Sequence, residues 1–304
     1  MNVNLKAITT ESRNPNTMDI DLLSTKEIIE KINHEDKTIA FQVEKAIPQI
    51  ARVVDMVVES FEKEGRLIYM GAGTSGRIGI LDAVECPPTF GVHHDMVICL
   101  MAGGMKAMTV AVEGAEDSKE MAINDLKAIN ANANDIVIGI AASGRTPYVL
   151  GGVEYAKRIG IKTACITTSV NSILAQTVDY PIEAITGPEP ITGSTRMKSG
   201  TAQKMICNMI TTTSMIKLGK VYENLMIDVQ ATNLKLVSRS LKIITDITNY
   251  NELEASKALK KYQTIKRVIF NYLTGIDDLA LIENFLNESN GHLRKAVNKA
   301  LRKE

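Results

Sequence analysis

Apolar residues in the first two thirds of the chain form short, β-branched runs that alternate with longer stretches of helical periodicity. The short runs stop at glycine, alanine or a hydroxyl-bearing residue, and they occupy positions 67–70, 96–101, 136–140, 162–167 and 180–185. Between them, apolar residues recur every three or four positions, which is the spacing of a helix with one buried face. Strands that alternate with helices are typical of a parallel sheet covered on both faces. The pattern therefore predicts an α/β fold with a doubly wound, mostly parallel five-stranded sheet.

Helical patterns without strands occupy both ends of the chain. A polar arm and a short helical stretch fill residues 1–35, and residues 36–62 carry apolar positions at helical spacing, with a break or kink at Pro48. From about Tyr222 onward the strand signals stop, and amphipathic helices are predicted over 230–248, 252–262, 264–273, 277–286 and 292–303. We therefore expect a sheet-containing domain at residues 1–222 and a small all-α domain at residues 223–304.

A glycine-rich loop, Gly71-Ala72-Gly73-Thr74-Ser75-Gly76, follows the first predicted strand and precedes a helical pattern. Glycine lets the backbone turn tightly and approach a ligand closely. The amide groups at the start of the following helix carry partial positive charge. The loop is therefore predicted to bind an anion, and a phosphate group fits this chemistry.

The same loop satisfies the G-x-G-x-x-G pattern of dinucleotide-binding folds, which makes a dinucleotide site an alternative. Such a fold places an acidic residue roughly 20 positions on, at the end of the next strand. Here that strand ends in Ala102-Gly103-Gly104, without a carboxylate. A second hydroxyl-bearing loop, 142–147, follows the third strand, and a third, 192–201, opens a long helix to about Lys217. These loops favour a compact sugar phosphate over a dinucleotide.

Charge and composition exclude several classes of partner. Lys and Arg number 35, as do Asp and Glu, and 45% of the residues are apolar, which is ordinary for a globular protein. A balanced charge argues against a nucleic-acid partner. No apolar run reaches the roughly 18 to 20 residues that span a bilayer, and the N-terminus is too polar for a signal peptide. We expect a cytoplasmic protein with neither a membrane nor a nucleic-acid partner.

Cysteine and histidine spacing argues against a metal site. The four cysteines stand singly, without the paired spacings of zinc or redox sites, and are predicted to be reduced. His93 and His94 form an adjacent pair on a predicted surface turn, and the remaining two histidines, His34 and His292, are isolated. We therefore expect no metal cofactor.

Two carboxylates lie at predicted helix ends. Glu85 precedes Pro87-Pro88, and because the residue before proline is pushed out of helical geometry, its helix is predicted to end there. Glu116 lies in a turn before a helix that Asp117 or Ser118 is expected to cap. Viewed alone, each is most simply a solvated surface charge.

Several of these segments together resemble the N-acetylmuramic acid 6-phosphate etherase family, which is built on the sugar isomerase (SIS) fold. The similar segments run through nearly the whole chain, at 10–14, 71–77, 80–88, 111–117, 141–147 and 192–204, while the C-terminal helices are less similar. The resemblance places the family's two catalytic glutamates at Glu85 and Glu116. It places the substrate-binding loops at Gly73, Thr74, Ser75, Ser143, Gly144, Arg145, Thr146, Ser194, Thr195 and Lys198.

The resemblance implies a carbon–oxygen lyase that needs neither metal nor nucleotide. Its substrate would be a small sugar phosphate, N-acetylmuramic acid 6-phosphate, and its products N-acetylglucosamine 6-phosphate and D-lactate, formed in the recycling of cell-wall sugars. The fold family further implies a homodimer with sites near the subunit interface. Two alternatives are a non-catalytic sugar-phosphate sensor on the same fold, which would have no use for the glutamate pair, and an aldose–ketose sugar-phosphate isomerase.

The predicted positions of the two glutamates indicate different roles. The negative end of a helix dipole next to Glu85 favours a protonated acid, and the positive end next to Glu116 favours a carboxylate. We therefore expect Glu85 to act as the general acid and Glu116 as the general base.

Overall fold

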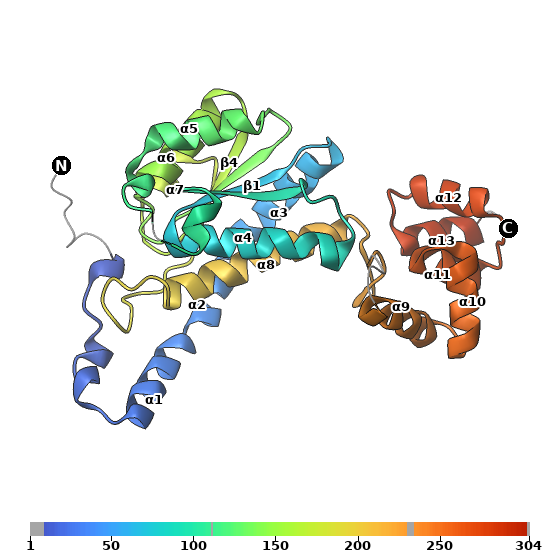
Figure 1. Ribbon diagram of the computed structural model, residues 1–304, viewed down its shortest axis with the longest axis horizontal. Helices are drawn as coiled ribbons and strands as arrows, with labels where there is room; N and C mark the ends of the chain where they lie inside the picture. Colours follow the sequence, from blue (N-terminus) through green and yellow to red (C-terminus); the bar gives the residue numbers. More distant parts are fainter. Residues whose placement is uncertain (1–8, 111, 230–233, 303–304) are drawn as a thin grey trace. The chain divides into compact units, whose positions relative to one another are not determined.

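The computed structural model describes residues 9–110, 112–229 and 234–302 (Figure 1). Its described residues divide into two compact units, one within 1–84 and 94–211 and the other within 85–93 and 212–304. The first unit contains the large sheet, and the second is mainly helical. The domain boundary predicted after residue 222 stays a prediction.

The sheet of the larger unit has five parallel strands, which confirms the predicted doubly wound α/β fold. Every strand pairs in parallel with its neighbour, in the order β2-β1-β3-β4-β5. The strands are β1 (Leu67–Gly71), β2 (Val97–Met101), β3 (Ile136–Ile140), β4 (Lys162–Thr167) and β5 (Tyr180–Glu183). The central strands β1 and β3 are buried along their whole length, as expected of strands covered on both faces.

Helices cover both faces of this sheet, with α5 and α6 on one side of β1 and α3 and α4 on the other (Figure 1). On the first side, Ile68, Met70 and Val137 pack with residues of α5, α6 and α7 in one apolar core. The helices of this part of the chain are α1 (Thr25–Asp36), α2 (Ile39–Lys45), α3 (Ile47–Glu62), α4 (Gly73–Phe90), α5 (Lys119–Ala128), α6 (Pro147–Arg158), α7 (Ile173–Thr177) and α8 (Lys198–Lys217).

The strand order positions the predicted ligand loops. β1 pairs with both β2 and β3, so β2 is added on one side of β1 and β3 to β5 are added on the other. The direction of strand addition therefore reverses at β1. In open parallel sheets, ligands bind at the carboxyl ends of the strands where this change of direction occurs. The loop after β1 and the loop after β3 therefore start side by side, since Gly71 is the register partner of Ile140.

The predicted end of the helix at Pro87-Pro88 is wrong, because α4 continues through both prolines to Phe90. A proline inside a helix removes one backbone donor and crowds the preceding turn. Here Phe90 is buried, and the N–H of Gly91 donates to the carbonyl of Pro87 at 2.9 Å. Burial beyond the prolines thus keeps helical geometry where local propensity disfavours it.

Smaller differences from the sequence-based expectations are local. After β2 the chain forms a single 3₁₀ turn, η5 (Met105–Met108), and Ala111 lies outside the described residues. The break expected at Pro48 falls at Ala46, so that Pro48 occupies the first turn of α3, where its missing N–H costs no hydrogen bond. Past the expected end of the strands, β6 (Val221–Tyr222) and β7 (Leu225–Met226) form a short antiparallel pair.

The smaller unit is built on the predicted C-terminal helices. They are α9 (Leu234–Ile247), α10 (Glu252–Tyr262), α11 (Ile265–Thr274), α12 (Leu279–Asn287) and α13 (Leu293–Leu301), and residues 230–233 lie outside the described residues. Their apolar faces meet in one core that includes Ile244, Val268, Phe270 and Ile282. Asn251 caps α10 and Asp278 caps α12, each accepting a backbone N–H of the first turn.

Candidate functional site

A pocket of about 440 Å³ lies at the carboxyl edge of the sheet. Three hydroxyl-bearing loops, the turn that carries Glu116 and the N-terminal arm all contribute to its wall. The lining residues are Thr10, Glu11, Ala72, Gly73, Thr74, Ser75, Glu116, Asp117, Ala141, Ala142, Ser143, Arg145, Thr146, Pro147, Gly193 and Thr195. The tertiary structure thus brings together, from positions far apart in the sequence, eight of the twelve predicted site residues: Gly73, Thr74, Ser75, Glu116, Ser143, Arg145, Thr146 and Thr195.

The first loop joins β1 to α4, and its glycines permit a very tight turn. A Cβ atom on Gly71 would lie 2.7 Å from the backbone nitrogen of Gly76, which no side chain allows. Gly73 has a φ of +52°, in the left-handed region that favours glycine. Because the chain turns so sharply, Thr74 and Ser75 line the pocket within the first turn of α4.

The second loop joins β3 to α6 and is shaped by Gly144. This buried residue has a φ of +62°, and a Cβ atom there would lie 2.3 Å from the hydroxyl oxygen of Ser172. Gly144 therefore sets the backbone conformation of the loop, while Ser143 and Arg145 on either side line the pocket. Thr146 is the N-cap residue of α6, and Pro147 occupies the first helical position.

The first turns of α4 and α6 both contribute residues to the pocket wall, which favours a bound anion. The backbone amides at a helix N-terminus carry partial positive charge that attracts phosphate. The charged side chains of the wall are the base Arg145 and the acids Glu11, Glu116 and Asp117. A ligand that suits this wall carries an anionic group for the amides and hydroxyls, and neutral donors for the carboxylates.

The third loop supplies Thr195 and Gly193 to the pocket, whereas Ser194 and Lys198 do not line it. Lys198 is buried, and its ammonium group lies 2.6 Å from a carboxylate oxygen of Glu35 in α1. The ammonium also donates to the carbonyl of Pro188 at 3.1 Å. Lys198 is therefore positioned to hold the loop in place.

Two pocket residues of the N-terminal arm, Thr10 and Glu11, were not predicted as site residues. The backbone N–H of Gly193 donates to the carbonyl of Thr10 at 3.1 Å, which fixes the arm against the third loop. A Cβ atom on Gly193 would lie 3.1 Å from a carboxylate oxygen of Glu11, so glycine leaves room for that side chain. The signal for these residues was the family-like segment 10–14, in an otherwise polar arm.

The two predicted catalytic glutamates lie in different settings. Glu116 lies in a 3₁₀ turn, η6 (Ala115–Asp117), and lines the pocket two residues before Ser118, whose hydroxyl caps α5. Glu85 is exposed on α4 and is not among the residues that line the pocket. At about 1.5 Å per residue, it lies roughly 18 Å along the helix from Gly73.

A second, smaller hollow of about 260 Å³ adjoins the pocket, because Ala72, Gly73 and Glu116 line both. Its wall is largely apolar and includes Met101, Ala107 and Val112. The guanidinium of Arg77, which also lines it, donates to the backbone carbonyls of Ala107 and Met108 at 2.8 and 3.1 Å. Glu116 therefore borders both a polar and an apolar cavity.

A buried polar network ties α4 to α8 and β1. Asp82 accepts hydrogen bonds from Asn208 at 2.6 Å and from Tyr69 and Thr211 at 3.1 Å each. Burial raises the pKa of Asp82, and these three donors offset part of that rise. Such a satisfied network fixes the position of α4, the helix that follows the first loop.

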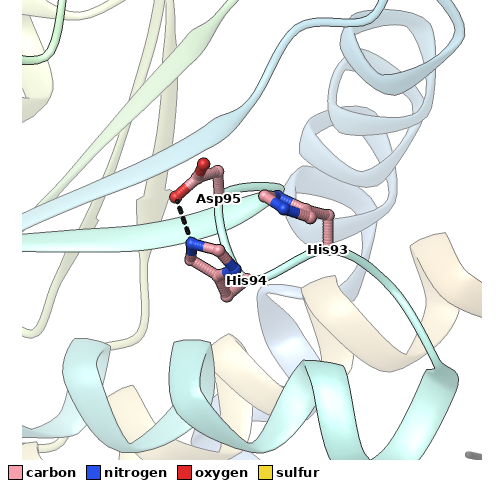
Figure 2. Close-up of side chains that lie close together, drawn as sticks. All are labelled: His93, His94 and Asp95. Carbon is pink, nitrogen blue, oxygen red and sulfur yellow. Dashed lines mark ion pairs between the residues drawn. The ribbon is translucent and has the colours of Figure 1, made fainter.

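The histidine and cysteine side chains supply no enclosed site among the described residues. Figure 2 shows His93, His94 and Asp95, whose potential ligand atoms lie within 4.8 Å of one another. All three are exposed and consecutive in sequence, so they do not surround an ion, and His94 pairs with Asp95 at 3.2 Å. Burial raises the pKa of Cys99 to about 12, which disfavours a nucleophilic thiolate.

Family models assign the sheet-containing part of the chain to the SIS class of domains. Residues 104–213 match the SIS domain, and residues 49–157 match the glucokinase regulatory protein N-terminal SIS domain. A solved phosphoheptose isomerase from Neisseria gonorrhoeae is similar over 63% of this chain and 98% of its own, with 13% identity and a TM-score of 0.49. None of the helices among the described residues is long and apolar enough to cross a membrane.

Relatives of nearly the same length identify the family within this class. An N-acetylmuramic acid 6-phosphate etherase from Vibrio atlanticus (strain LGP32) is 52% identical, covering 96% of each chain. One from Bacillus cereus (strain ATCC 10987 / NRS 248) is 52% identical, covering 96% of this chain and all of its own. One from Enterobacter sp. (strain 638) is 49% identical over 97% of this chain and 99% of its own. The chain belongs to the N-acetylmuramic acid 6-phosphate etherase family.

Proposed function

We propose that this protein is a lyase that cleaves the lactyl ether of N-acetylmuramic acid 6-phosphate. The products are N-acetylglucosamine 6-phosphate and D-lactate, and the reaction serves the recycling of cell-wall amino sugars in the cytoplasm. The observation that supports this most is the single pocket that joins hydroxyl-bearing loops, helix N-termini and Glu116 in a chain of the etherase family. The loops suit a phosphate group, and the carboxylate suits proton transfer.

The catalytic groups of the protein need only transfer protons in this chemistry. In the open-chain sugar, the aldehyde acidifies the hydrogen at C2, and a base removes it. The C3–O bond then breaks, the departing lactate oxygen receives a proton from an acid, and an unsaturated aldehyde remains. Water adds at C3 and a proton returns to C2, which gives the product. One ionised and one protonated carboxyl group, proposed as Glu116 and Glu85, are sufficient for this sequence.

Incubation of the purified protein with N-acetylmuramic acid 6-phosphate, followed by an assay for D-lactate, tests the proposal directly. Release of D-lactate together with N-acetylglucosamine 6-phosphate is the expected result. Tight binding without turnover would indicate a sugar-phosphate sensor instead. Conversion of an aldose phosphate to a ketose phosphate, with the ether intact, would indicate an isomerase.

Ser143→Ala is expected to raise KM roughly 10- to 100-fold and to change kcat little. The serine lines the pocket, and a neutral donor to a charged acceptor contributes about 1.5–3 kcal/mol. Steady-state kinetics with the sugar phosphate measures both constants, and Ser75→Ala is expected to behave in the same way. Thr109→Ala, which alters an exposed hydroxyl outside the pocket, is the matched control. A normal KM for Ser143→Ala would remove this residue from the phosphate site.

We further propose that the protein acts as a homodimer with its sites near the subunit interface. Leu81 and Val84 are 51% and 57% exposed on α4, three residues apart and therefore on one face of the helix. Large exposed apolar side chains that form a stripe mark a surface that a partner covers. A second copy bound there would bring its surface to Glu85, which directly follows Val84.

Val84→Lys is expected to convert the dimer to a monomer and to abolish most of the lactate release, because a charge would enter an apolar interface. Sedimentation velocity at the assay concentration measures the oligomeric state. Leu253→Lys, which places the same charge on another exposed apolar position, is the control and should leave the dimer intact. A wild-type protein that is fully active as a monomer would contradict this prediction.

A further inference from the structure

The hydroxyl group of Ser75 points its hydrogen away from the ligand that the pocket is proposed to hold. Its Oγ donates to Oε1 of Gln203 at 2.9 Å. A serine hydroxyl has one hydrogen and two lone pairs, so Ser75 in this arrangement offers the pocket only acceptor character. A phosphate group requires donors. The hydroxyl must therefore reverse its polarity before it can contribute to phosphate binding.

The side chain of Gln203 is equipped for this reversal. It lies on α8, is 1% exposed, and its amide nitrogen Nε2 has no hydrogen-bond partner among the described residues. A buried amide that makes a bond through its oxygen while its two N–H groups remain unpaired is unfavourable. The terminal torsion of glutamine is broad and roughly two-fold, so a half-turn exchanges the oxygen and the nitrogen in nearly the same space.

We propose that Gln203 is a positioning residue that reverses the hydroxyl of Ser75 when a phosphate group enters the pocket. After the half-turn, Nε2 donates to Ser75 Oγ, and the hydroxyl hydrogen turns to the phosphate. A donor chain from amide to hydroxyl to anion results, in which each bond polarises the next. The inference rests on the proposed function, because it takes the pocket to bind a sugar phosphate.

Glutamine is the residue type that this reversal of the Ser75 hydroxyl requires. A glutamate in its place has the same shape, but its ionised carboxylate can only accept, so it would hold the Ser75 hydrogen permanently. In a Gln203→Glu protein, Ser75 would therefore no longer contribute to phosphate binding. If Gln203 were only a fixed acceptor, Gln203→Glu would preserve that bond, and Ser75 would contribute as much as before.

A double-mutant cycle separates the two possibilities. Inorganic phosphate is titrated into the full-length wild type, Ser75→Ala, Gln203→Glu and the double variant by calorimetry. We expect Ser75→Ala to weaken binding about 10-fold in the wild type and less than about 2-fold in the Gln203→Glu background. The repulsion between the introduced carboxylate and phosphate is common to both proteins of that background and cancels in their comparison. Equal effects of Ser75→Ala in both backgrounds would overturn the inference.

The wild-type protein provides a second measurement that does not depend on the folding of Gln203→Glu. In a ¹⁵N-labelled sample, the side-chain amide resonances of Gln203 are expected to shift when inorganic phosphate is added, and not to shift in Ser75→Ala. Unchanged amide resonances in a wild type that binds phosphate would overturn the inference. The proposed function fails separately, if phosphate binds with the expected coupling but the wild type releases no D-lactate.

Discussion

In deuterium oxide, the Glu85→Gln variant is expected to exchange the C2 hydrogen of N-acetylmuramic acid 6-phosphate with solvent while it releases no D-lactate. The Glu116→Gln variant is expected to do neither. In both variants lactate release should fall by roughly 10²- to 10⁴-fold, which is the usual contribution of a positioned general acid or base. Mass spectrometry of the recovered sugar phosphate measures the exchange, and an enzymatic assay measures the lactate.

This assignment of roles rests on a predicted helix end at Glu85, but α4 continues past Glu85 to Phe90. Pro87 and Pro88 have no N–H, so the carbonyls of Ala83 and Val84 cannot accept the helical bond that these positions would otherwise supply. These two carbonyl oxygens next to Glu85 therefore lack their helical donors. Glu116 instead lies in η6, two residues before Ser118, the N-cap of α5.

The helix-terminus effect is typically only about 0.3–1 kcal/mol, so the experiment must be able to reverse the assignment. If Glu85→Gln abolishes exchange and Glu116→Gln retains it, the acid and base roles are exchanged. If one variant abolishes both exchange and release while the other retains both, a single glutamate transfers every proton. Glu120→Gln, which alters an exposed acid on α5 outside the pocket, is the control and should leave both activities unchanged.

Lys198→Met is expected to lower the free energy of unfolding by about 3–5 kcal/mol, because it leaves the charge of Glu35 buried without its partner. The two side chains are only 4% and 6% exposed, and their charged atoms lie 2.6 Å apart. Asn14 and Asn16 complete the cluster by donating to the two oxygens of Glu35 at 2.8 Å each. Urea titration followed by circular dichroism measures the loss.

Lys198→Met should also raise KM, since the cluster around Glu35 and Lys198 holds the N-terminal arm and the third loop together beside the pocket. The double variant with Glu35→Leu is expected to recover much of the stability, because both charges are then removed. Lys26→Met, which removes an exposed ion pair with Glu30, is the control and should cost less than about 0.5 kcal/mol. A comparably small loss for Lys198→Met would show that the buried pair does not stabilise the fold.

The same cluster gives this stabilisation a defined dependence on pH. Burial raises the pKa of Glu35, but the hydrogen bonds from Lys198, Asn16 and Asn14 and the charge of Lys198 outweigh it, so the pKa is lowered below its ordinary value of 4.5. A lowered folded-state pKa means that the stabilisation is present above about pH 4.5 and is lost as the pH falls through the folded-state value. Lys198→Met should therefore show a weaker loss of stability with acid than the wild type.

The sequence by itself determined the elements and the family. Short β-branched runs and helical periodicity are local properties, so the five strands and the long helix α8 were predicted close to their observed bounds. The glycines of the first two loops are equally local, because a tight turn before a helix depends on residues a few positions apart. The similar segments spread through the chain were sufficient to recognise the etherase family.

The tertiary structure decided which of these segments meet. Strand order is not encoded in periodicity, and only the pairing of β1 with β3 starts the loops after these strands side by side. Thr10 reaches the pocket through a hydrogen bond to a loop more than 180 residues away, and Lys198 pairs with Glu35 across a similar separation. The burial of Phe90 stabilises helical geometry in α4 beyond its two prolines. Each of these outcomes depends on contacts between residues distant in sequence, whose free energy outweighs local preference only once the chain has folded.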